Sequence, residues 1–141
     1  MSRQNIIFRI SCTLLGLSCL TSCGLKSVEL GPVETVEAFY TAVTTGKWCE
    51  AESLCDTLSM QDYFETNKHA WDRMTKKDEK AMTIARSVLE QTNLTIVDMH
   101  KDGDRRIVLY TLEVNGQSKQ QKATLKKEEG AWRVERIAEE N

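Results

Sequence analysis

Three polar side chains with the spacing of metal ligands occur near the middle of the 141-residue chain. Glu65, His69 and Asp72 would share one face of a helix, and carboxylate and imidazole groups arranged in this way can bind a divalent metal. Three polar residues on one face are more typical of a solvated helix surface. His69 follows Lys68, and the other histidine, His100, lies among charged residues. We therefore expect both histidines to face solvent, and we predict no metal site.

Two tyrosines are the other candidates for chemistry. Tyr40 and Tyr110 lie on apolar segments and could point their hydroxyls inward, where a phenol can donate a hydrogen bond to a developing oxyanion. Catalysis would also need an acid or base with a shifted pKa beside them, and the pattern places no carboxylate there. Glycine-rich phosphate loops, dinucleotide fingerprints and Cys-x-x-Cys pairs are missing from the sequence. We predict no catalytic residue, no cofactor and no enzymatic activity.

Cys49 and Cys55 could form a disulfide or remain two separate thiols. In a continuous helix their Cα atoms would be about 9 Å apart along the axis, beyond the ~7 Å limit for a bridge. A disulfide would therefore require the helix to break near Ser53. An oxidising compartment would permit the bond, and both alternatives remain open.

The N-terminal residues have the layout of a secretory signal peptide. Arg3 and Arg9 give residues 1–9 a positive charge without any acid, and an uncharged run rich in Leu and Ile follows over residues 10–20. This run is about half the ~20 residues that a helix needs to cross a hydrocarbon core. We therefore predict a signal peptide and no transmembrane anchor.

The residues Leu20-Thr21-Ser22-Cys23 resemble the lipobox of bacterial lipoproteins, in which an apolar residue and two small residues precede a cysteine. The resemblance implies that residues 1–22 are removed, that the Cys23 sulfur receives a diacylglycerol, and that the freed amine is acylated with a chain such as palmitate. Gly24 stands where an Asp would resemble an inner-membrane retention signal. We therefore expect a cell-envelope protein that is anchored to the outer membrane through Cys23 and faces the periplasm.

The mature chain is predicted to contain a tether, residues 23–30, and one domain, residues 31–141. Loss of Arg3 and Arg9 with the signal peptide takes the formal net charge from −2 to −4. Such a domain lacks the basic excess that phosphate binding requires, so we exclude a nucleic-acid partner.

The first half of the domain has the periodicity of helices. Pro32 is a good first residue of a helix and Gly46 a good stop, with apolar residues at three- and four-residue steps between them. Apolar stripes that include Met74 and Ile84 continue the pattern. The further helical segments are residues 47–58 and residues 59–92, with a break near residues 76–78.

Past Asn93 the period changes to alternation, and turn signals occur at nearly even spacing. The pattern predicts four antiparallel strands, over residues 94–101, 105–114, 117–127 and 131–138. The second strand is apolar on both faces and should be central, whereas the third is mostly polar. The order predicts an α+β fold in which three to four helices pack on one face of a curved four-stranded antiparallel sheet.

Three motifs resemble a group of small bacterial lipoprotein domains. They are residues 32–40 running into Thr45-Gly46-Lys47-Trp48, the helical segment 50–54, and a closing hairpin over residues 125–134 that ends in Gly-x-Trp-x-Val. The group has the cone-shaped nuclear transport factor 2-like (cystatin-like) fold, is often described as lumazine-binding-like, and is mostly of unknown function. The superfamily contains both enzymes and binding modules, so the resemblance implies a fold and leaves the activity open.

The sequence thus predicts a membrane-anchored envelope lipoprotein whose domain binds a small apolar ligand or an envelope protein without catalysis. An isomerase- or dehydratase-like enzyme that uses the cone as its pocket is the alternative. The polar third strand favours a monomer over a dimer formed through the sheet, although the sequence does not fix the oligomeric state. Five aromatic residues are expected to line the core or a pocket: Phe39, Tyr40, Trp48, Tyr110 and Trp132.

Overall fold

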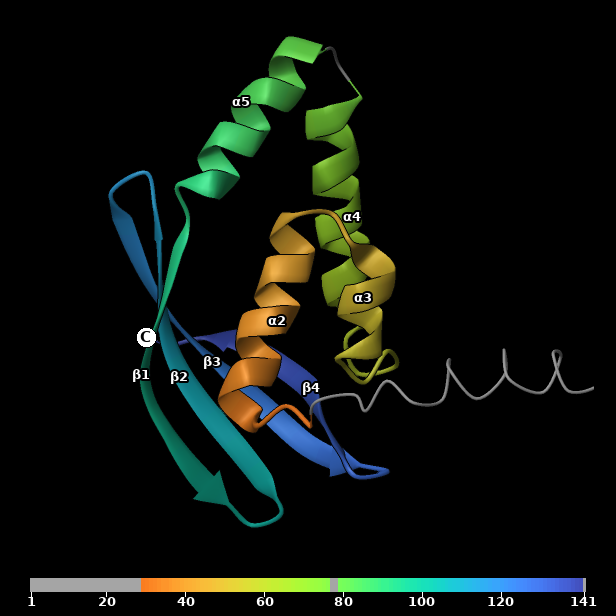
Figure 1. Ribbon diagram of the computed structural model, residues 1–141, viewed down its shortest axis with the longest axis vertical. Helices are drawn as coiled ribbons and strands as arrows, with labels where there is room; N and C mark the ends of the chain where they lie inside the picture. The colour runs from red at the N-terminus through yellow and green to blue at the C-terminus, as the bar shows by residue number, and fades with distance from the viewer. Residues whose placement is uncertain (1–28, 77–78, 141) are drawn as a thin grey trace, which may run out of the picture.

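The computed structural model describes residues 29–76 and 79–140, which form helices followed by a curved antiparallel sheet (Figure 1). The predicted α+β architecture is thereby confirmed. The helices are α2 (Pro32–Thr44), α3 (Trp48–Ser53), α4 (Gln61–Thr75) and α5 (Glu79–Glu90), and the strands are β1 (Asn93–Asp102), β2 (Arg105–Val114), β3 (Gln117–Glu128) and β4 (Ala131–Glu139).

Helix α2 packs along the concave face of the sheet. Pro32 occupies its first turn, as predicted, and the Thr35 hydroxyl donates to the Gly31 carbonyl at 2.7 Å. The helix ends at Thr44, and Gly46 then adopts a φ of +71°, a left-handed conformation that glycine reaches without steric cost.

Helix α3 is shorter than the predicted segment 47–58. After Ser53 the backbone forms hydrogen bonds with the edge strand β4. The Val134 amide donates to the Leu54 carbonyl at 3.0 Å, and the Asp56 amide donates to the Val134 carbonyl at 2.8 Å. These long-range bonds replace the helical ones. Periodicity within the segment carries no information about them, which is why the predicted helix is too long.

Helices α4 and α5 form an arm that rises from the sheet and turns back toward it (Figure 1). They lie on the two sides of the predicted break near residues 76–78, of which 77 and 78 are outside the described residues. Ile84 on α5 is 63% exposed and Met74 on α4 is 41% exposed, so the predicted apolar stripes are only partly covered.

The sheet is a meander in which each strand pairs with the next along the chain. The predicted bounds of β2 agree with the structure, and those of the other strands differ by one or two residues. Strand β2 is central, as predicted, and its inward residues Val108, Tyr110 and Leu112 are buried. Single-residue register shifts at Val97 in β1 and Glu135 in β4 bend the edge strands, as β-bulges do.

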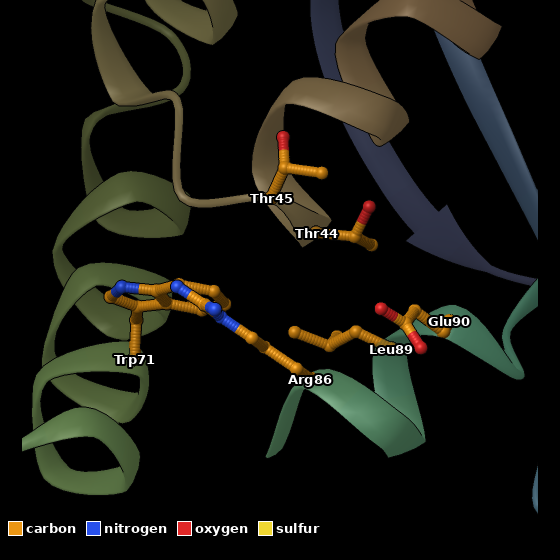
Figure 2. A pocket seen from close by; sticks show the side chains of 6 residues that line it. All are labelled: Thr44, Thr45, Trp71, Arg86, Leu89 and Glu90. Atoms are coloured by element: carbon orange, nitrogen blue, oxygen red, sulfur yellow. The ribbon is translucent and has the colours of Figure 1, made fainter. Parts of the chain in front are cut away.

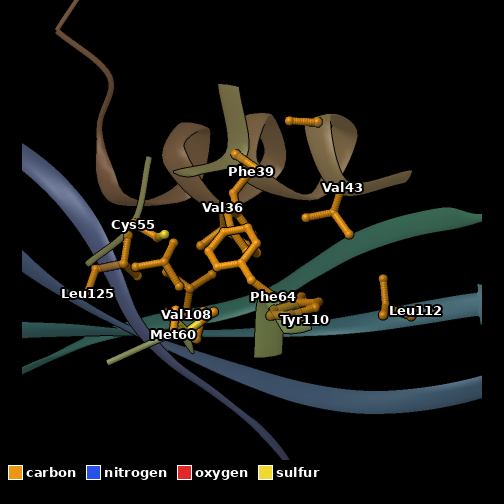
Figure 3. Close-up of a cluster of buried hydrophobic side chains, with 14 residues drawn as sticks. Val36, Phe39, Val43, Cys55, Met60, Phe64, Val108, Tyr110, Leu112 and Leu125 are labelled. Atoms are coloured by element: carbon orange, nitrogen blue, oxygen red, sulfur yellow. The ribbon is translucent and has the colours of Figure 1, made fainter. Parts of the chain in front are cut away.

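The core fills the space between α2, α4 and the sheet (Figure 3). Phe39 is 1% exposed, and its ring lies 5.8 Å from the Tyr63 ring and 6.1 Å from the Phe64 ring. Ala123 and Leu125, on the mostly polar strand β3, are fully buried. Aromatic and aliphatic side chains therefore occupy the interior that a cone would offer to a ligand.

Candidate ligand-binding site

The five aromatic residues that the sequence singled out belong to the core or pack against it. Phe39 and Tyr110 are buried, and Tyr40, Trp48 and Trp132 are half-buried at its boundary. They were expected to line either a core or a pocket; Phe39 and Tyr110 form part of the core, and Trp132 also borders a hollow beside the β3–β4 turn.

The surroundings of the interior tyrosine hydroxyls keep them protonated and neutral. The Tyr110 hydroxyl donates to Gln121 Oε1 at 3.1 Å. Burial raises the pKa of Tyr40, Tyr63 and Tyr110, and the negative charge that a neighbouring tyrosinate would carry raises the pKa of Tyr63 and Tyr110 further. Such phenols can donate hydrogen bonds but are poor proton acceptors at neutral pH.

Cys49 and Cys55 are separate free thiols. Helix α3 does end at Ser53, between them, yet Cys49 is exposed whereas Cys55 is buried beside Val134 of β4. Burial raises the pKa of the Cys55 thiol to about 12, and the nearby carboxylates of the same segment add to the effect. Of the two open alternatives, the structure contains the unbonded one.

The remaining sequence candidates lie on the surface or outside the described residues. His69 and His100 are exposed, as expected. Among residues 29–76 and 79–140, no group of three His, Cys, Asp or Glu side chains could hold a metal ion, and this includes Glu65, His69 and Asp72. Within the same residues no helix is long and apolar enough to cross a membrane. Cys23 and residues 1–22 lie outside the described part of the chain.

A pocket of about 350 Å³ lies where the arm meets the end of α2 (Figure 2). We call it the α2–α4–α5 pocket, after the helices that supply its walls. Its lining residues are Thr44, Thr45, Trp71, Arg86, Leu89 and Glu90. Sequence reasoning missed this site, because its walls come from three helices whose mutual angles no local pattern encodes.

Trp71 forms a fixed aromatic wall of this pocket. A Cβ at Gly46 would lie only 2.7 Å from Trp71 Cζ2 and 2.8 Å from Cε2, so the indole rests directly on the backbone of the α2–α3 corner. The Trp48 ring meets the Trp71 ring edge to face at 6.4 Å. The glycine and the second indole therefore limit the positions that the Trp71 side chain can adopt.

A second hollow, of about 540 Å³, lies at the opposite end of the sheet beside Leu30 and the β3–β4 turn. Trp132 forms part of its lining. The Arg106 guanidinium lies 5.1 Å and the Lys127 ammonium 5.8 Å from the centre of the Trp132 ring, which are cation–π distances. Lys127 also binds the Glu29 carboxylate at 3.1 Å, which fastens the start of the described chain to this end of the domain.

Comparison with known proteins gives structural likenesses alone. No protein-family model matches the chain, and no curated protein matches it. A SEC-C motif containing protein from Rhodopseudomonas palustris is 16% identical, with a TM-score of 0.48 over 78% of this chain and 79% of that one. A nuclear transport factor 2-like protein of unknown function from Cytophaga hutchinsonii is 11% identical, with a TM-score of 0.40 over 81% of this chain and 94% of that one.

A de novo designed protein with a curved β-sheet is 18% identical, with a TM-score of 0.33 over 45% of this chain and 62% of that one. At these identities and TM-scores, the likenesses concern the arrangement of helices and sheet and carry no argument about function. What the chain does must therefore be argued from its own residues.

Proposed function

We propose that the protein is a lipid-anchored bacterial envelope protein whose domain binds a small ligand in the α2–α4–α5 pocket without catalysing a reaction. The pocket itself is the observation that supports binding most directly. Its volume of about 350 Å³ lies within the ~300–1,000 Å³ of small-molecule sites, and it has a fixed aromatic wall in Trp71. The core beside it has no comparable space for a ligand, since bulky side chains fill it.

The anchor is proposed on the lipobox resemblance at Cys23. Two or three acyl chains hold a protein on a bilayer, whereas one binds reversibly. The segment from Cys23 to Glu29 spans at most about 20 Å when fully extended. The domain would therefore stay close to the membrane, with the C-terminal end of β3, where Lys127 binds Glu29, on the membrane side. Gly24 supports the outer membrane and its periplasmic face as the location.

The absence of catalysis is proposed on the chemistry of the two candidate regions. The α2–α4–α5 pocket has one carboxylate, Glu90, among its lining residues. The interior tyrosines have raised pKa values, which suits neutral hydrogen-bond donors and not general bases. The motifs in residues 32–48 and 125–134 support a nuclear transport factor 2-like domain, a fold that hosts enzymes and binding modules alike.

A second candidate function is docking of an envelope protein on strand β1. This strand is an edge of the sheet, and its Val97 and Met99 side chains are 55% and 42% exposed. An unpaired edge with exposed apolar side chains can accept a strand from a partner. Val97→Lys and Met99→Lys should abolish such docking and leave ligand binding in the pocket unchanged.

Metabolic labelling tests the anchor. Bacteria that express the full chain should incorporate an alkyne analogue of palmitate into it, and Cys23→Ser should abolish the label. Cys19→Ser is the matched control, because it removes a neighbouring thiol and leaves the lipobox intact. Equal labelling of the two variants would contradict the proposed attachment site.

Native mass spectrometry tests the pocket. The full chain, extracted from bacterial membranes, should carry a small molecule that is released on activation. Leu89→Trp should eliminate this molecule by filling the pocket, whereas Leu109→Trp, on the convex face of β2, should retain it. Retention of the same molecule by both variants would place binding elsewhere.

A further inference from the structure

We infer that the α2–α4–α5 pocket takes a small dipolar ligand, with an anionic group held by Arg86, an apolar body between Trp71 and Leu89, and a cationic or hydrogen-bond-donating group held at Glu90 and Thr44. The inference rests on the proposed binding function and specifies the chemical class of the ligand. It differs from the purely apolar ligand that the sequence suggested.

The positive end of the pocket is formed by Arg86. Its side chain extends from α5 toward Trp71, and among the described residues it makes no ion pair (Figure 2). The contrast within the chain is Arg105, whose Nε and Nη2 atoms bind the two oxygens of Glu135 at 2.8 and 3.1 Å. A guanidinium presents a planar fork of donors that matches a carboxylate. Arg86 thus offers this fork to a ligand at the edge of the aromatic wall.

The other end of the pocket offers hydrogen-bond acceptors. The Thr44 hydroxyl donates to the Tyr40 carbonyl at 3.0 Å, and the Thr45 hydroxyl donates to the Thr41 carbonyl at 2.7 Å. Their hydrogens are thereby used within α2, and the oxygen lone pairs remain for a donor. Glu90 adds an ionised carboxylate, which only accepts. A ligand group placed here is therefore favoured when it carries N–H or O–H hydrogens, most of all when it is cationic.

The two charged ends are separated along the pocket. Figure 2 shows the Arg86 guanidinium beside Trp71 and the Glu90 carboxylate at the far side of Leu89. No ion pair joins Arg86 to Glu90 within the described residues, although they are four positions apart on α5. An apolar body that spans Leu89 would place one polar group at each end. The volume of about 350 Å³ favours a small molecule over a long acyl chain.

Three probes of nearly equal size test the inference on the full chain in detergent. They are 4-(aminomethyl)benzoate, which has a charge at each end of one ring, 4-methylbenzoate, which has the anionic end alone, and 4-methylbenzylamine, which has the cationic end alone. Binding is measured by tryptophan fluorescence, with micelles alone as the blank. We expect the dipolar probe to bind up to about fivefold more tightly than either single-ended probe, the upper end of the range for exposed ion pairs.

Two variants with matched controls test which residue binds each charged end of the dipolar probe. Arg86→Gln should remove the advantage of the dipolar probe over 4-methylbenzylamine, and Arg136→Gln, an exposed arginine of β4, should preserve it. Glu90→Gln should remove the advantage over 4-methylbenzoate, and Glu113→Gln, on β2, should preserve it.

Equal dissociation constants for the three probes would overturn the inference and leave the proposed function standing with an apolar ligand. Equal effects of Arg86→Gln and Arg136→Gln would also overturn it. Failure of all three probes to bind would overturn the inference, while the proposed function would be decided separately by the molecule retained in native mass spectrometry.

Discussion

The core, where α2 and the N-terminal part of α4 pack against the sheet, and the outer part of the arm, which is mostly α5, differ in how completely they bury apolar side chains. Phe39 on α2 is 1% exposed and lies against other aromatic rings, whereas Ile84 on α5 is 63% exposed. The arm rises away from the sheet, and the α2–α4–α5 pocket lies at its base (Figures 1 and 2). The filled region provides stability, and the incompletely packed region leaves the space that a ligand needs.

This difference explains why the two regions call for different experiments. In the core, a lost methylene or hydroxyl group leaves a cavity or an unpaired group, so stability is the sensitive readout. In α5, the described side chains already contact water, and substitutions there should alter binding more than folding. Substitutions inside and outside the core test this division.

Phe39→Ala should destabilise the domain by about 3–5 kcal/mol, because it empties a site surrounded by the Tyr63 and Phe64 rings. Ile84→Ala, in the arm, should change the free energy of unfolding by less than about 0.5 kcal/mol. Urea unfolding followed by circular dichroism measures both. Similar losses for the two variants would show that the arm is as tightly packed as the core.

Gly46→Ala should destabilise by about 1–3 kcal/mol more than Gly103→Ala. Both glycines have positive φ angles, +71° and +58°, so both substitutions carry the backbone strain. A Cβ at Gly46 would also meet Trp71 at 2.7 Å, whereas a Cβ at Gly103 would meet nothing within 4 Å. The Trp71 indole must then move, and tryptophan emission should shift for Gly46→Ala alone. Equal stabilities would contradict the close contact between Gly46 and the aromatic wall.

Tyr110→Phe should cost about 1 kcal/mol, because it removes the hydrogen bond to Gln121 Oε1 in a partly buried setting. Tyr40→Phe removes a half-buried hydroxyl for which the described structure shows no hydrogen bond, and it should cost less. Thermal unfolding of the two variants measures the difference. A larger loss for Tyr40→Phe would mean that the Tyr40 hydroxyl has a partner of its own.

Stability should fall as the pH rises above about 9, and Cys55 contributes to this fall. Its folded pKa of about 12 is above the unfolded value of about 9, so the folded state retains the proton that the unfolded state loses. The stabilisation that Cys55 contributes to the folded state is complete below about pH 9 and is lost between about pH 9 and 12. Urea midpoints between about pH 8 and 10.5 should therefore decline less steeply for Cys55→Ala than for the parent chain. Identical slopes would show that Cys55 is not protected by burial.

The sheet could be predicted from the sequence because its signals are local. Asn115-Gly116 and Glu129-Gly130 adopt the positive φ angles of tight hairpins, and alternation between such turns fixes the strands almost to the residue. The end of α3 could not be predicted, since it depends on bonds between Leu54 and Val134 that are remote in sequence.

The candidate site depends even more on contacts between segments that are remote in sequence. The stripe containing Ile84 predicted a helix, and the angle at which the arm leaves the sheet leaves Ile84 exposed. That angle also creates the pocket, so Trp71 and Arg86 had no sequence signal that set them apart from other helical residues. Of the five aromatic residues expected in a core or a pocket, Phe39 and Tyr110 are buried, while the buried Phe64 was not among them, and the space between the helices required the structure.

The indole N–H resonances of the three tryptophans test most directly whether binding occurs at the arm or at the opposite end of the domain. Two-dimensional NMR of the ¹⁵N-labelled full chain, with 4-(aminomethyl)benzoate as the added ligand and with Trp→Phe variants for assignment, would locate the site. The account predicts a shift of the Trp71 resonance that follows saturation, with the Trp132 resonance unchanged. A shift at Trp132, with none at Trp71, would contradict it and place binding at the opposite end of the domain.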